Sequence, residues 1–354
     1  MKIFTDCRFF RGDIPCVLSK QHNVTCEGCL SYEKIGRQIL IIKLGAIGDV
    51  IRTTPLLRKI RAEFPDAYIW WVTETPDILT DKWVDKRIKP NFENVELLKC
   101  LEFDWLINLD KDPIAIALAA KITAKKKSGF TVDAYGRSTY FGSDAEKHKW
   151  VTGAFDSISR QNTKHYVQEI LEIAGYEFAG EEYILEVQPC AYNWDIDKTK
   201  KVIGLNTGCG IRWHTRLWPE NQWIELVRLL INYNYEVVLL GGADEDEKNK
   251  RIAAESGAKY FGIYPLKTFF ALMDKTDLVV SAVSMGFHVA VGLKKKLVLF
   301  NNIFNKNEFY LYGRGIILEP DGGCTCYFAQ SCDKHCMDNL MPAAVLDAVN
   351  KLLI

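Results

Sequence analysis

The stretch of residues 38–65, QILIIKLGAIGDVIRTTPLLRKIRAEFP, constrains the fold more than any other part of this chain. An apolar run at residues 39–44, broken only by Lys43, leads into a glycine-bounded turn, and Asp49 then opens a helical pattern of apolar residues. That order predicts a strand, a tight loop and a helix, which is the first unit of a parallel α/β sheet. Anionic ligands and catalytic groups gather at the sheet edge where such a loop lies.

Asp49 has two interpretations on this pattern. An aspartate that opens a helix is commonly an N-cap, and Gly-x-x-Gly in such a loop is commonly only a turn. A carboxylate at this edge can also act as a general base that accepts a proton from a substrate hydroxyl.

The rest of the chain predicts two α/β domains behind a cysteine-bearing arm of residues 1–35, which has no helical periodicity and is expected to lack helices. Residues 36–186 alternate strands (68–73, 104–109) with helices (113–123, 165–174), and the polar residues 187–200 are expected to form a linker. A second series at 201–340 has strands at 201–206, 236–240, 277–281 and 296–300, with helices at 220–231, 245–256 and 285–293. Residues 341–354 are expected to form an amphipathic C-terminal helix. With 354 residues, 48% of them hydrophobic, the chain can bury two cores. We therefore expect two Rossmann-like parallel-sheet domains that face a cleft.

The charges balance, with 45 Lys and Arg against 45 Asp and Glu, which argues against a general nucleic-acid binder. The run KITAKKK at residues 121–127 is the exception. It is either a solvated helix end or an electropositive rim that attracts an anionic acceptor or a membrane surface.

No apolar run is long enough to span a bilayer, and the N-terminus lacks the apolar segment of a secretory signal. We expect a cytoplasmic protein, with peripheral contact at the inner membrane as an open alternative.

Two further loops carry candidate ligand-binding residues. Residues 206–219, NTGCGIRWHTRLWP, follow a predicted strand and hold two arginines before a helix start, which suits a pyrophosphate but also a solvated surface loop. Residues 281–288, SAVSMGFH, lie between a strand and a helix, where small residues and backbone N–H groups can hold a phosphate. His288 can equally be a buried core histidine.

Eight of the eleven cysteines fall in two groups. Cys7, Cys16, Cys26 and Cys29 contain one C-x-x-C pair, and four thiolates can hold zinc or iron, with disulfides as the competing account. Cys324, Cys326, Cys332 and Cys336 are less regularly spaced, with His335 as a substitute ligand. Either site would be structural, and the two groups could share one site. Spacing leaves zinc, iron and an iron–sulfur cluster open.

The motifs together resemble glycosyltransferase family 9, the heptosyltransferases that add sugars to bacterial lipopolysaccharide cores and related acceptors. LGAIGDVIRTTPLLRKIRAEFP is similar to the family's opening motif. Residues 206–219 are similar to its N-P-G-x-x-x-x-x-x-K-x-W-P element, with Arg216 at the lysine position and Thr207 in place of proline. Residues 283–288 resemble its Asp-Thr-x-Gly-x-His motif, in which Ser284, Gly286 and His288 match, and Val283 replaces the aspartate. The resemblance runs from about residue 38 to the C-terminus, so the arm lies outside it.

This resemblance implies a GT-B fold and an inverting glycosyltransferase with Asp49 as the base and Arg216 at the departing diphosphate. It implies an ADP-heptose-like donor held by Thr207, Gly208, Arg212, Glu247 (or Asp244), Ser284, Met285, Gly286 and His288. We place Gly45, Ala46 and Arg61 at the acceptor, a lipopolysaccharide core or another surface glycan, and expect no catalytic metal. The alternative is a non-catalytic GT-B descendant that serves as a binding or metal-bearing scaffold, which the substitution at Val283 favours.

Overall fold

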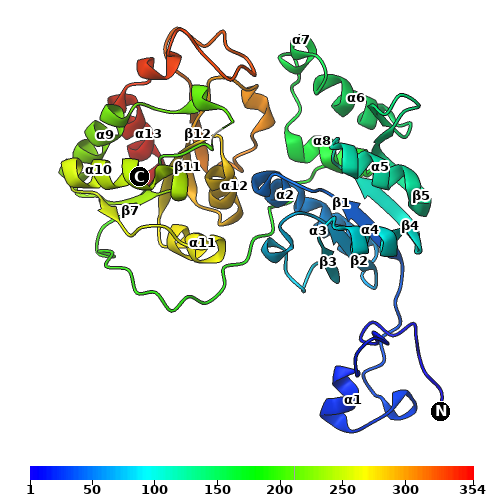
Figure 1. Ribbon diagram of the computed structural model, residues 1–354. Helices are drawn as coiled ribbons and strands as arrows, with labels where there is room; N and C mark the ends of the chain where they lie inside the picture. The colour runs from blue at the N-terminus through cyan, green and yellow to red at the C-terminus, as the bar shows by residue number, and fades with distance from the viewer. Residues whose placement is uncertain (211) are drawn as a thin grey trace. The chain divides into compact units, whose positions relative to one another are not determined.

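The structure is a computed structural model that describes residues 1–210 and 212–354 (Figure 1). By their contacts, these residues form two compact units. Unit 1 comprises Met1–Leu44 and Leu56–Glu146, and unit 2 comprises Gly45–Pro55 and Lys147–Ile354. The short segment that carries Asp49 therefore belongs with the second half of the chain. The domain boundaries expected from the sequence stay a prediction.

Unit 1 is built on a six-stranded sheet of order β3-β2-β1-β4-β5-β6. All neighbouring strands are parallel except β5 and β6, which pair antiparallel. The central strands are continuous apolar runs because both faces of a parallel sheet are buried. The strands are β1 (Gln38–Ile42), β2 (Tyr68–Val72), β3 (Lys86–Ile88), β4 (Glu102–Asn108), β5 (Thr123–Val132) and β6 (Ser138–Tyr140). The helices are α1 (Val17–His22), η1 (Cys26–Gly28), α3 (Pro55–Glu63), η2 (Pro76–Ile78), α4 (Phe92–Lys99), α5 (Pro113–Lys121) and α6 (Asp144–Thr152), of which α3 begins and α6 ends in unit 2.

Unit 2 contains a second six-stranded sheet, all parallel, of order β12-β11-β10-β7-β8-β9. Its core packs Trp218, Trp223 and Phe300 against the sheet. The strands are β7 (Val202–Asn206), β8 (Glu236–Leu240), β9 (Lys259–Tyr260), β10 (Leu278–Ala282), β11 (Lys296–Phe300) and β12 (Gly315–Leu318). The helices are α2 (Ile47–Thr53), α7 (Asp156–Ser159), α8 (Tyr166–Ile173), η3 (His214–Arg216), α9 (Glu220–Asn232), η4 (Ala243–Glu245), α10 (Asp246–Ser256), α11 (Leu266–Asp274), α12 (Met285–Gly292), η5 (Lys306–Glu308), η6 (Cys336–Asn339) and α13 (Pro342–Leu353).

Counted within its own unit, each sheet has the strand order 3-2-1-4-5-6 of a doubly wound fold. In such a sheet the order in which strands are added reverses between the first and fourth strands, which stay parallel, and ligands bind beyond the carboxyl ends of those two strands. In unit 2 these strands are β7 and β10, so Asn206 and Ala282 mark the switch point. The expected α/β class with two Rossmann-like parallel sheets is confirmed.

Three local expectations need correction. Asp49 is not an N-cap, because α2 begins at Ile47 after Ala46 and Asp49 lies in its first turn. The KITAKKK run is not a helix end, since α5 stops at Lys121 and the following lysines lie on β5. The arm, expected to lack helices, contains α1. Residues 187–200 have neither helix nor strand, and their role as a linker stays a prediction. Within the described residues, no helix has the length and apolar character needed to cross a membrane.

Candidate functional site

Helix α2 packs against α12 inside unit 2, and Gly48 lies at their contact. A Cβ at position 48 would lie 2.5 Å from Cδ2 of His288 and 3.4 Å from Cα of Met285. Carbon atoms do not approach so closely in packed interiors, so the contact requires glycine. Gly48 therefore brings the first turn of α2, which carries Asp49, next to α12, the helix that carries His288. The opening motif and the motif of residues 281–288 meet at this contact.

Asp49 is held by an ion-pair chain. Its Oδ1 lies 2.7 Å from Nη2 of Arg52, and Nη1 of Arg52 lies 2.7 Å from Oε1 of Glu308. Burial alone would lower the pKa of Arg52, but the carboxylates of Asp49 and Glu308 raise it, so the guanidinium stays charged. The Arg52 guanidinium also lies 3.5 Å from the ring centre of Tyr166. The Asp49 side chain is 32% exposed, so the chain orients a carboxylate that a substrate hydroxyl can reach.

His288 is buried, with only 6% of its surface exposed. Its ring packs against Phe287, with centroids 4.4 Å apart. Burial, and to a smaller extent the charge on Arg52, lowers the pKa of His288 to about 3, so the imidazole is neutral at neutral pH. Among the described residues, Nδ1 of His288 has no hydrogen-bond partner. Buried polar atoms of proteins are normally paired, so this nitrogen is a candidate contact for a ligand.

The loops that leave β7 and β10 meet through Asn206. Its Nδ2 lies within hydrogen-bonding distance of three oxygens: Oγ of Ser281 at 3.0 Å, Oγ of Ser284 at 3.1 Å and the carbonyl of Gly208 at 3.0 Å. A Cβ at Gly286 would lie 2.7 Å from the same amide group. The structure therefore brings Gly208, Ser284 and Gly286 together at the switch point of the second sheet.

Arg216 spans that switch point. Its Nη1 donates to the carbonyl of Val283 after β10, and its Nη2 donates to the carbonyl of Cys209 after β7, at 2.6 Å. The side chain is buried, which lowers the pKa of Arg216. Within the described part of the chain no carboxylate pairs with Arg216. A buried cation without a counterion favours the binding of an anion beside it.

Two residues that the sequence did not single out complete this edge. Glu245 accepts from the backbone N–H of Gly242 at 2.8 Å and lies so close to Gly208 that a Cβ there would overlap its carboxylate. Nζ of Lys248 donates to the carbonyl of Thr207 at 2.9 Å. The acid three residues after Gly242 has the spacing of a capping box, so Glu245 could have been found; no motif marks Lys248.

The other predicted residues lie as follows. Thr207 is buried and donates to Oδ1 of Asn249 at 2.6 Å, and Met285 is partly buried. Arg212 is exposed beside the ring of Trp213, and Glu247 is exposed and pairs with Lys250 at 2.8 Å, as does Asp246 with the same lysine. Gly45 and Ala46 precede α2. Arg61, in unit 1, donates to the carbonyls of Ala67 and Trp83 and to Asp85. The expected contacts of these residues with donor and acceptor stay predictions.

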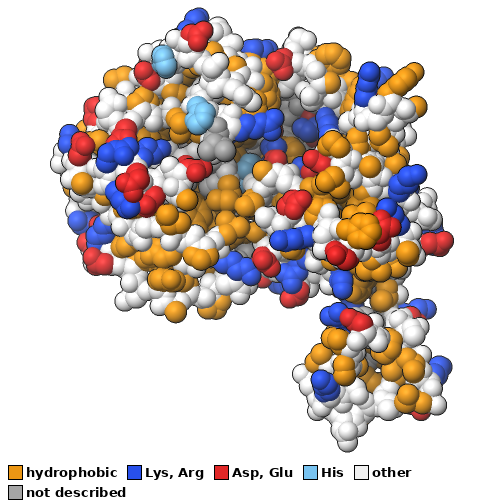
Figure 2. All heavy atoms as spheres, in the orientation of Figure 1, with side chains coloured by type: hydrophobic (Ala, Val, Ile, Leu, Met, Phe, Trp, Pro, Cys, Tyr) orange, Lys and Arg blue, Asp and Glu red, His pale blue; other side chains and the backbone are white. Residues whose placement is uncertain are grey.

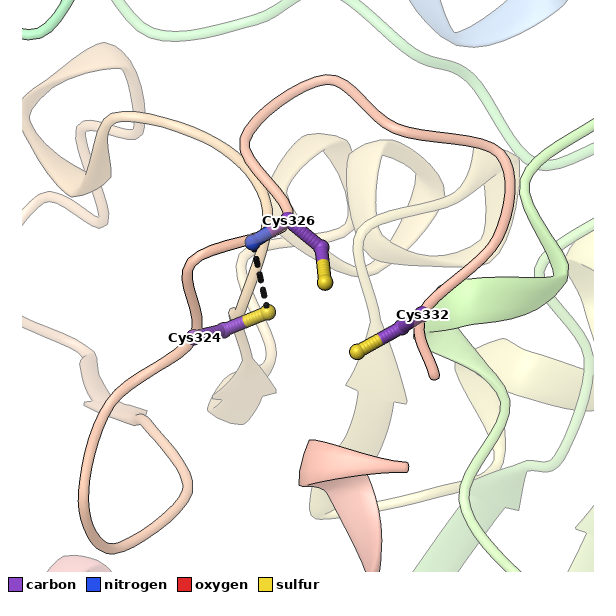
Figure 3. Close-up of side chains that lie close together, drawn as sticks. All are labelled: Cys324, Cys326 and Cys332. Carbon is purple, nitrogen blue, oxygen red and sulfur yellow. Dashed lines mark hydrogen bonds between the residues drawn. The ribbon is translucent and has the colours of Figure 1, made fainter. Parts of the chain in front are cut away.

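The C-terminal cysteines form a compact group (Figure 3). The ligand atoms of Cys324, Cys326 and Cys332 all lie within 4.8 Å of one another. Sγ of Cys336 lies 2.8 Å from Sγ of Cys324 and 3.4 Å from that of Cys332. The backbone N–H of Cys326 donates to Sγ of Cys324 at 3.3 Å, as backbone groups do around metal thiolates. The donor set therefore fits a four-cysteine ion site, and the exposed His335 is not part of it.

The N-terminal cysteines do not gather in this way. Among the described residues, no three ligand atoms of Cys7, Cys16, Cys26 and Cys29 lie within 4.8 Å of one another. The compact cysteine cluster of this chain is therefore the C-terminal one. None of the eleven cysteines forms a disulfide.

Comparisons with known proteins bear on the family and the fold of the chain. A model of glycosyltransferase family 9 (heptosyltransferase) matches residues 96–303, more than half of the chain. No curated protein matches the sequence.

Solved structures show the fold. The heptosyltransferase WaaC of E. coli, solved with ADP and with ADP-2-deoxy-2-fluoro heptose, is 15% identical over 89% of this chain and 99% of its own, with a TM-score of 0.64 in the ADP complex. A family 9 glycosyltransferase of Veillonella parvula DSM 2008 is 18% identical over 91% and 98%, with a TM-score of 0.66. The iron-containing dodecameric glycosyltransferase TibC of enterotoxigenic E. coli H10407 is 14% identical over 90% and 77%, with a TM-score of 0.55. These likenesses identify the fold as GT-B-like.

Proposed function

The chain belongs to glycosyltransferase family 9 (heptosyltransferase), and on that premise we propose that it is an inverting glycosyltransferase that uses a nucleotide-sugar donor. One observation carries the proposal: Asp49 presents an accessible carboxylate, held by Arg52, on the helix turn that packs against His288. A general base must be both reachable and oriented, and this arrangement supplies both conditions.

In the proposed reaction, Asp49 accepts the proton of an acceptor hydroxyl. The oxygen of that hydroxyl attacks the anomeric carbon of the donor from the face opposite the leaving group. The bond between this carbon and the diphosphate oxygen breaks, and the nucleoside diphosphate leaves with the bonding electrons. Arg216 and the backbone N–H groups at the switch point of unit 2 stabilise the negative charge on the departing oxygen.

The proposed donor is ADP-heptose or a close analogue. Two observations support it: the buried charge of Arg216, which has no carboxylate partner among the described residues and donates to the carbonyl of Cys209, favours a diphosphate, and WaaC, which has the same fold, is solved with ADP and an ADP-heptose analogue. Ser284, Gly286 and His288 are the proposed contacts to the donor. The proposed acceptor is a lipopolysaccharide core or another surface glycan, reached from a cytoplasmic or peripheral membrane position.

We further propose that Cys324, Cys326, Cys332 and Cys336 hold one structural zinc or iron ion. Such an ion would link these four cysteines to one another. Its role would be structural, because four protein ligands leave no open coordination position for a substrate. The ion would close the loop of residues 324–336, which contacts the proposed donor site near Arg216. Oγ1 of Thr215, the residue before Arg216, donates to the carbonyl of Ala329 in this loop at 3.0 Å. TibC, an iron-containing relative in fold, makes iron a natural candidate.

A second candidate is a non-catalytic descendant that uses the same fold as a scaffold. Val283 favours it, because an apolar side chain replaces the family's aspartate and cannot accept a hydrogen bond from a sugar hydroxyl. The Val283 side chain is buried, and its carbonyl accepts from Arg216.

A donor screen separates the two candidates. Binding and slow hydrolysis of ADP-heptose would be measured by calorimetry and nucleotide release beside GDP-, UDP- and dTDP-sugars. The transferase proposal expects one nucleotide-sugar to bind and to be hydrolysed or transferred. Binding of none of them would contradict it and favour the scaffold.

A further inference from the structure

The N-terminal arm, residues 1–35, has almost no hydrophobic core of its own. All its residues are described, and only Cys7 among them is buried. Figure 2 shows hydrophobic side chains on the surface of the arm, at its lower right. The exposed large apolar residues include Met1, Ile3, Phe9, Ile14, Val17 and Leu30. Its one α-helix, α1, has six residues and no side-chain cap. Chains shorter than about 40 residues generally need disulfides, metals or a partner to hold a fold.

A cavity of about 280 Å³ lies inside this arm, and all four of its cysteines line it. The rest of the wall is mostly apolar, with contributions from Ile3, Phe4, Phe10 and Leu18. None of the four thiols is used in a disulfide. Four free cysteines that line one mostly apolar cavity are a donor set for a metal or a metal cluster.

A single ion does not match this geometry. Four thiolates around one zinc ion, with Zn–S bonds of about 2.3 Å in a tetrahedron, lie about 3.8 Å from one another. The C-terminal cysteines of the same chain are gathered on that scale, but no three of the N-terminal ligand atoms lie within 4.8 Å of one another. The spacing agrees, because zinc ribbons use two close cysteine pairs, whereas the arm has one such pair, Cys26 and Cys29, and two isolated cysteines.

We propose that the arm binds a [4Fe–4S] cluster through Cys7, Cys16, Cys26 and Cys29. In such a cluster each thiolate binds a different iron, so the four sulfurs stand further apart than around one ion, which agrees with the wider spacing of these cysteines. Each thiol loses its proton on binding, and the protein undergoes no oxidation or reduction. The cluster fills the apolar interior that the arm's own side chains leave open.

The contacts of the arm indicate what the cluster stabilises. Cys7 forms a β-bridge with Lys34, close to the point where the chain enters β1. The next residue, Arg8, pairs with Asp85 and donates to the carbonyls of Asp66 at 2.9 Å and Ala67 at 3.2 Å. Ligation of Cys7 would therefore fix Arg8 against the turn that precedes β2. This proposal concerns the arm alone and does not depend on glycosyl transfer.

The full chain would be purified without oxygen, reconstituted with iron and sulfide, and analysed for iron, zinc and acid-labile sulfide. The variants are Cys7→Ser and the double variant Cys26→Ser, Cys29→Ser; the controls are Cys332→Ser, in the C-terminal group, and Cys100→Ser, an exposed thiol outside both groups. The expected result is about four sulfides per chain in the wild type and both controls, and loss of nearly all sulfide in the N-terminal variants.

The Mössbauer spectrum of the wild type gives a second readout that needs no variant to fold. A cubane doublet beside any mononuclear iron would support the proposal. A wild type without acid-labile sulfide, or with one zinc or iron ion lost from the N-terminal variants and no sulfide, would overturn it. Sulfide that disappears with Cys332→Ser and persists in the N-terminal variants would overturn it as well.

Discussion

Gly48 and His288 are in such close contact that a Cβ at residue 48 would lie 2.5 Å from Cδ2 of the histidine. The contact fixes the first turn of α2, which carries Asp49, against the first turn of α12. It also explains why a glycine must precede the aspartate, since α2 and α12 could not pack this way around any larger side chain. Residues 240 positions apart are thereby held in one site.

Replacing Gly48 with Ala should therefore damage the site more than the fold. The added methyl must push α2 or His288 aside, and overpacking of this kind costs about 1–3 kcal/mol of stability. We expect the rate of sugar transfer to fall by at least about tenfold, since small displacements of a reacting group cost that much or more. Steady-state kinetics and urea unfolding would measure both. Gly28→Ala, where a Cβ would meet only Val24 at 3.9 Å, is the control. Equal activity of Gly48→Ala and wild type would contradict the packing argument.

The buried neutral His288 should make stability depend on pH. Its pKa is about 3 in the folded chain, lowered first by burial, and the ordinary value of about 6.5 applies to the unfolded chain. Between these values the unfolded chain takes up a proton that the folded chain does not, so this contribution to stability is complete above pH 6.5 and is lost as the pH falls toward 3.

His288→Gln removes this titration. The wild-type free energy of unfolding should therefore fall more steeply than that of the variant, by up to about 1.4 kcal/mol per pH unit between pH 6 and 4. Denaturant titrations across this range give the slopes, with His22→Gln, an exposed histidine, as control. Parallel curves for wild type and His288→Gln would show that His288 is not buried and neutral.

Arg216 should be needed for nucleotide binding because it is the buried cation at the switch point of unit 2. Arg216→Gln removes the charge but keeps a side chain that can donate to the carbonyls of Cys209 or Val283. Loss of a charge-assisted contact predicts that the dissociation constant for ADP rises by about 10- to 100-fold. Calorimetry would measure it, and circular dichroism would confirm that the variant is folded. Replacing the exposed Arg212 with Gln should raise the dissociation constant for ADP less than Arg216→Gln does. A larger rise in Arg212→Gln than in Arg216→Gln would refute this role of Arg216.

A metal ion at the C-terminal cysteines should stabilise the loop of residues 324–336 and, through it, the proposed donor site near Arg216. Cys332→Ser should release about one metal ion per chain, lower the melting temperature and weaken ADP binding, because the loop contacts Thr215 beside Arg216. Cys190→Ser, a cysteine outside both groups, should do none of these. Elemental analysis and calorimetry on the same samples decide the matter: unchanged metal content in Cys332→Ser would refute the site, and unchanged ADP affinity after metal loss would refute the coupling.

The sequence predicted β1, β2 and β4 of the first sheet and β7, β8, β10 and β11 of the second, because these strands are continuous apolar runs bounded by glycine and polar residues, but it did not predict the other strands. It also placed Asn206, Ser284 and Asp49 at sheet edges, since the βα alternation by itself puts such loops there. Helix ends were less certain. Pro55 divides the helical pattern after Asp49 into α2 and α3, because proline supplies no N–H and clashes with the preceding turn.

Contacts between distant segments could not be predicted from pattern alone. Nothing in the sequence links Arg52 to Glu308, 256 residues away, or shows that Lys248 reaches the carbonyl of Thr207. By sequence, the N-terminal cysteine group with its C-x-x-C pair looks the better ion site, and the C-terminal group is less regularly spaced; spacing does not report distances between sulfurs. The structure distinguishes them: the C-terminal thiols lie close together, whereas the N-terminal cysteines lie further apart and line a cavity.

The most direct test of the account compares wild type with Asp49→Asn for both donor binding and turnover. Asn keeps the shape and a hydrogen bond to Arg52 but cannot accept the acceptor's proton. Glu93→Gln, an exposed acid in the first turn of α4, is the matched control. The account predicts that Asp49→Asn binds ADP-heptose within about threefold of wild type while transfer falls by at least about 100-fold, and that the control transfers normally. Transfer by Asp49→Asn at the wild-type rate would contradict it.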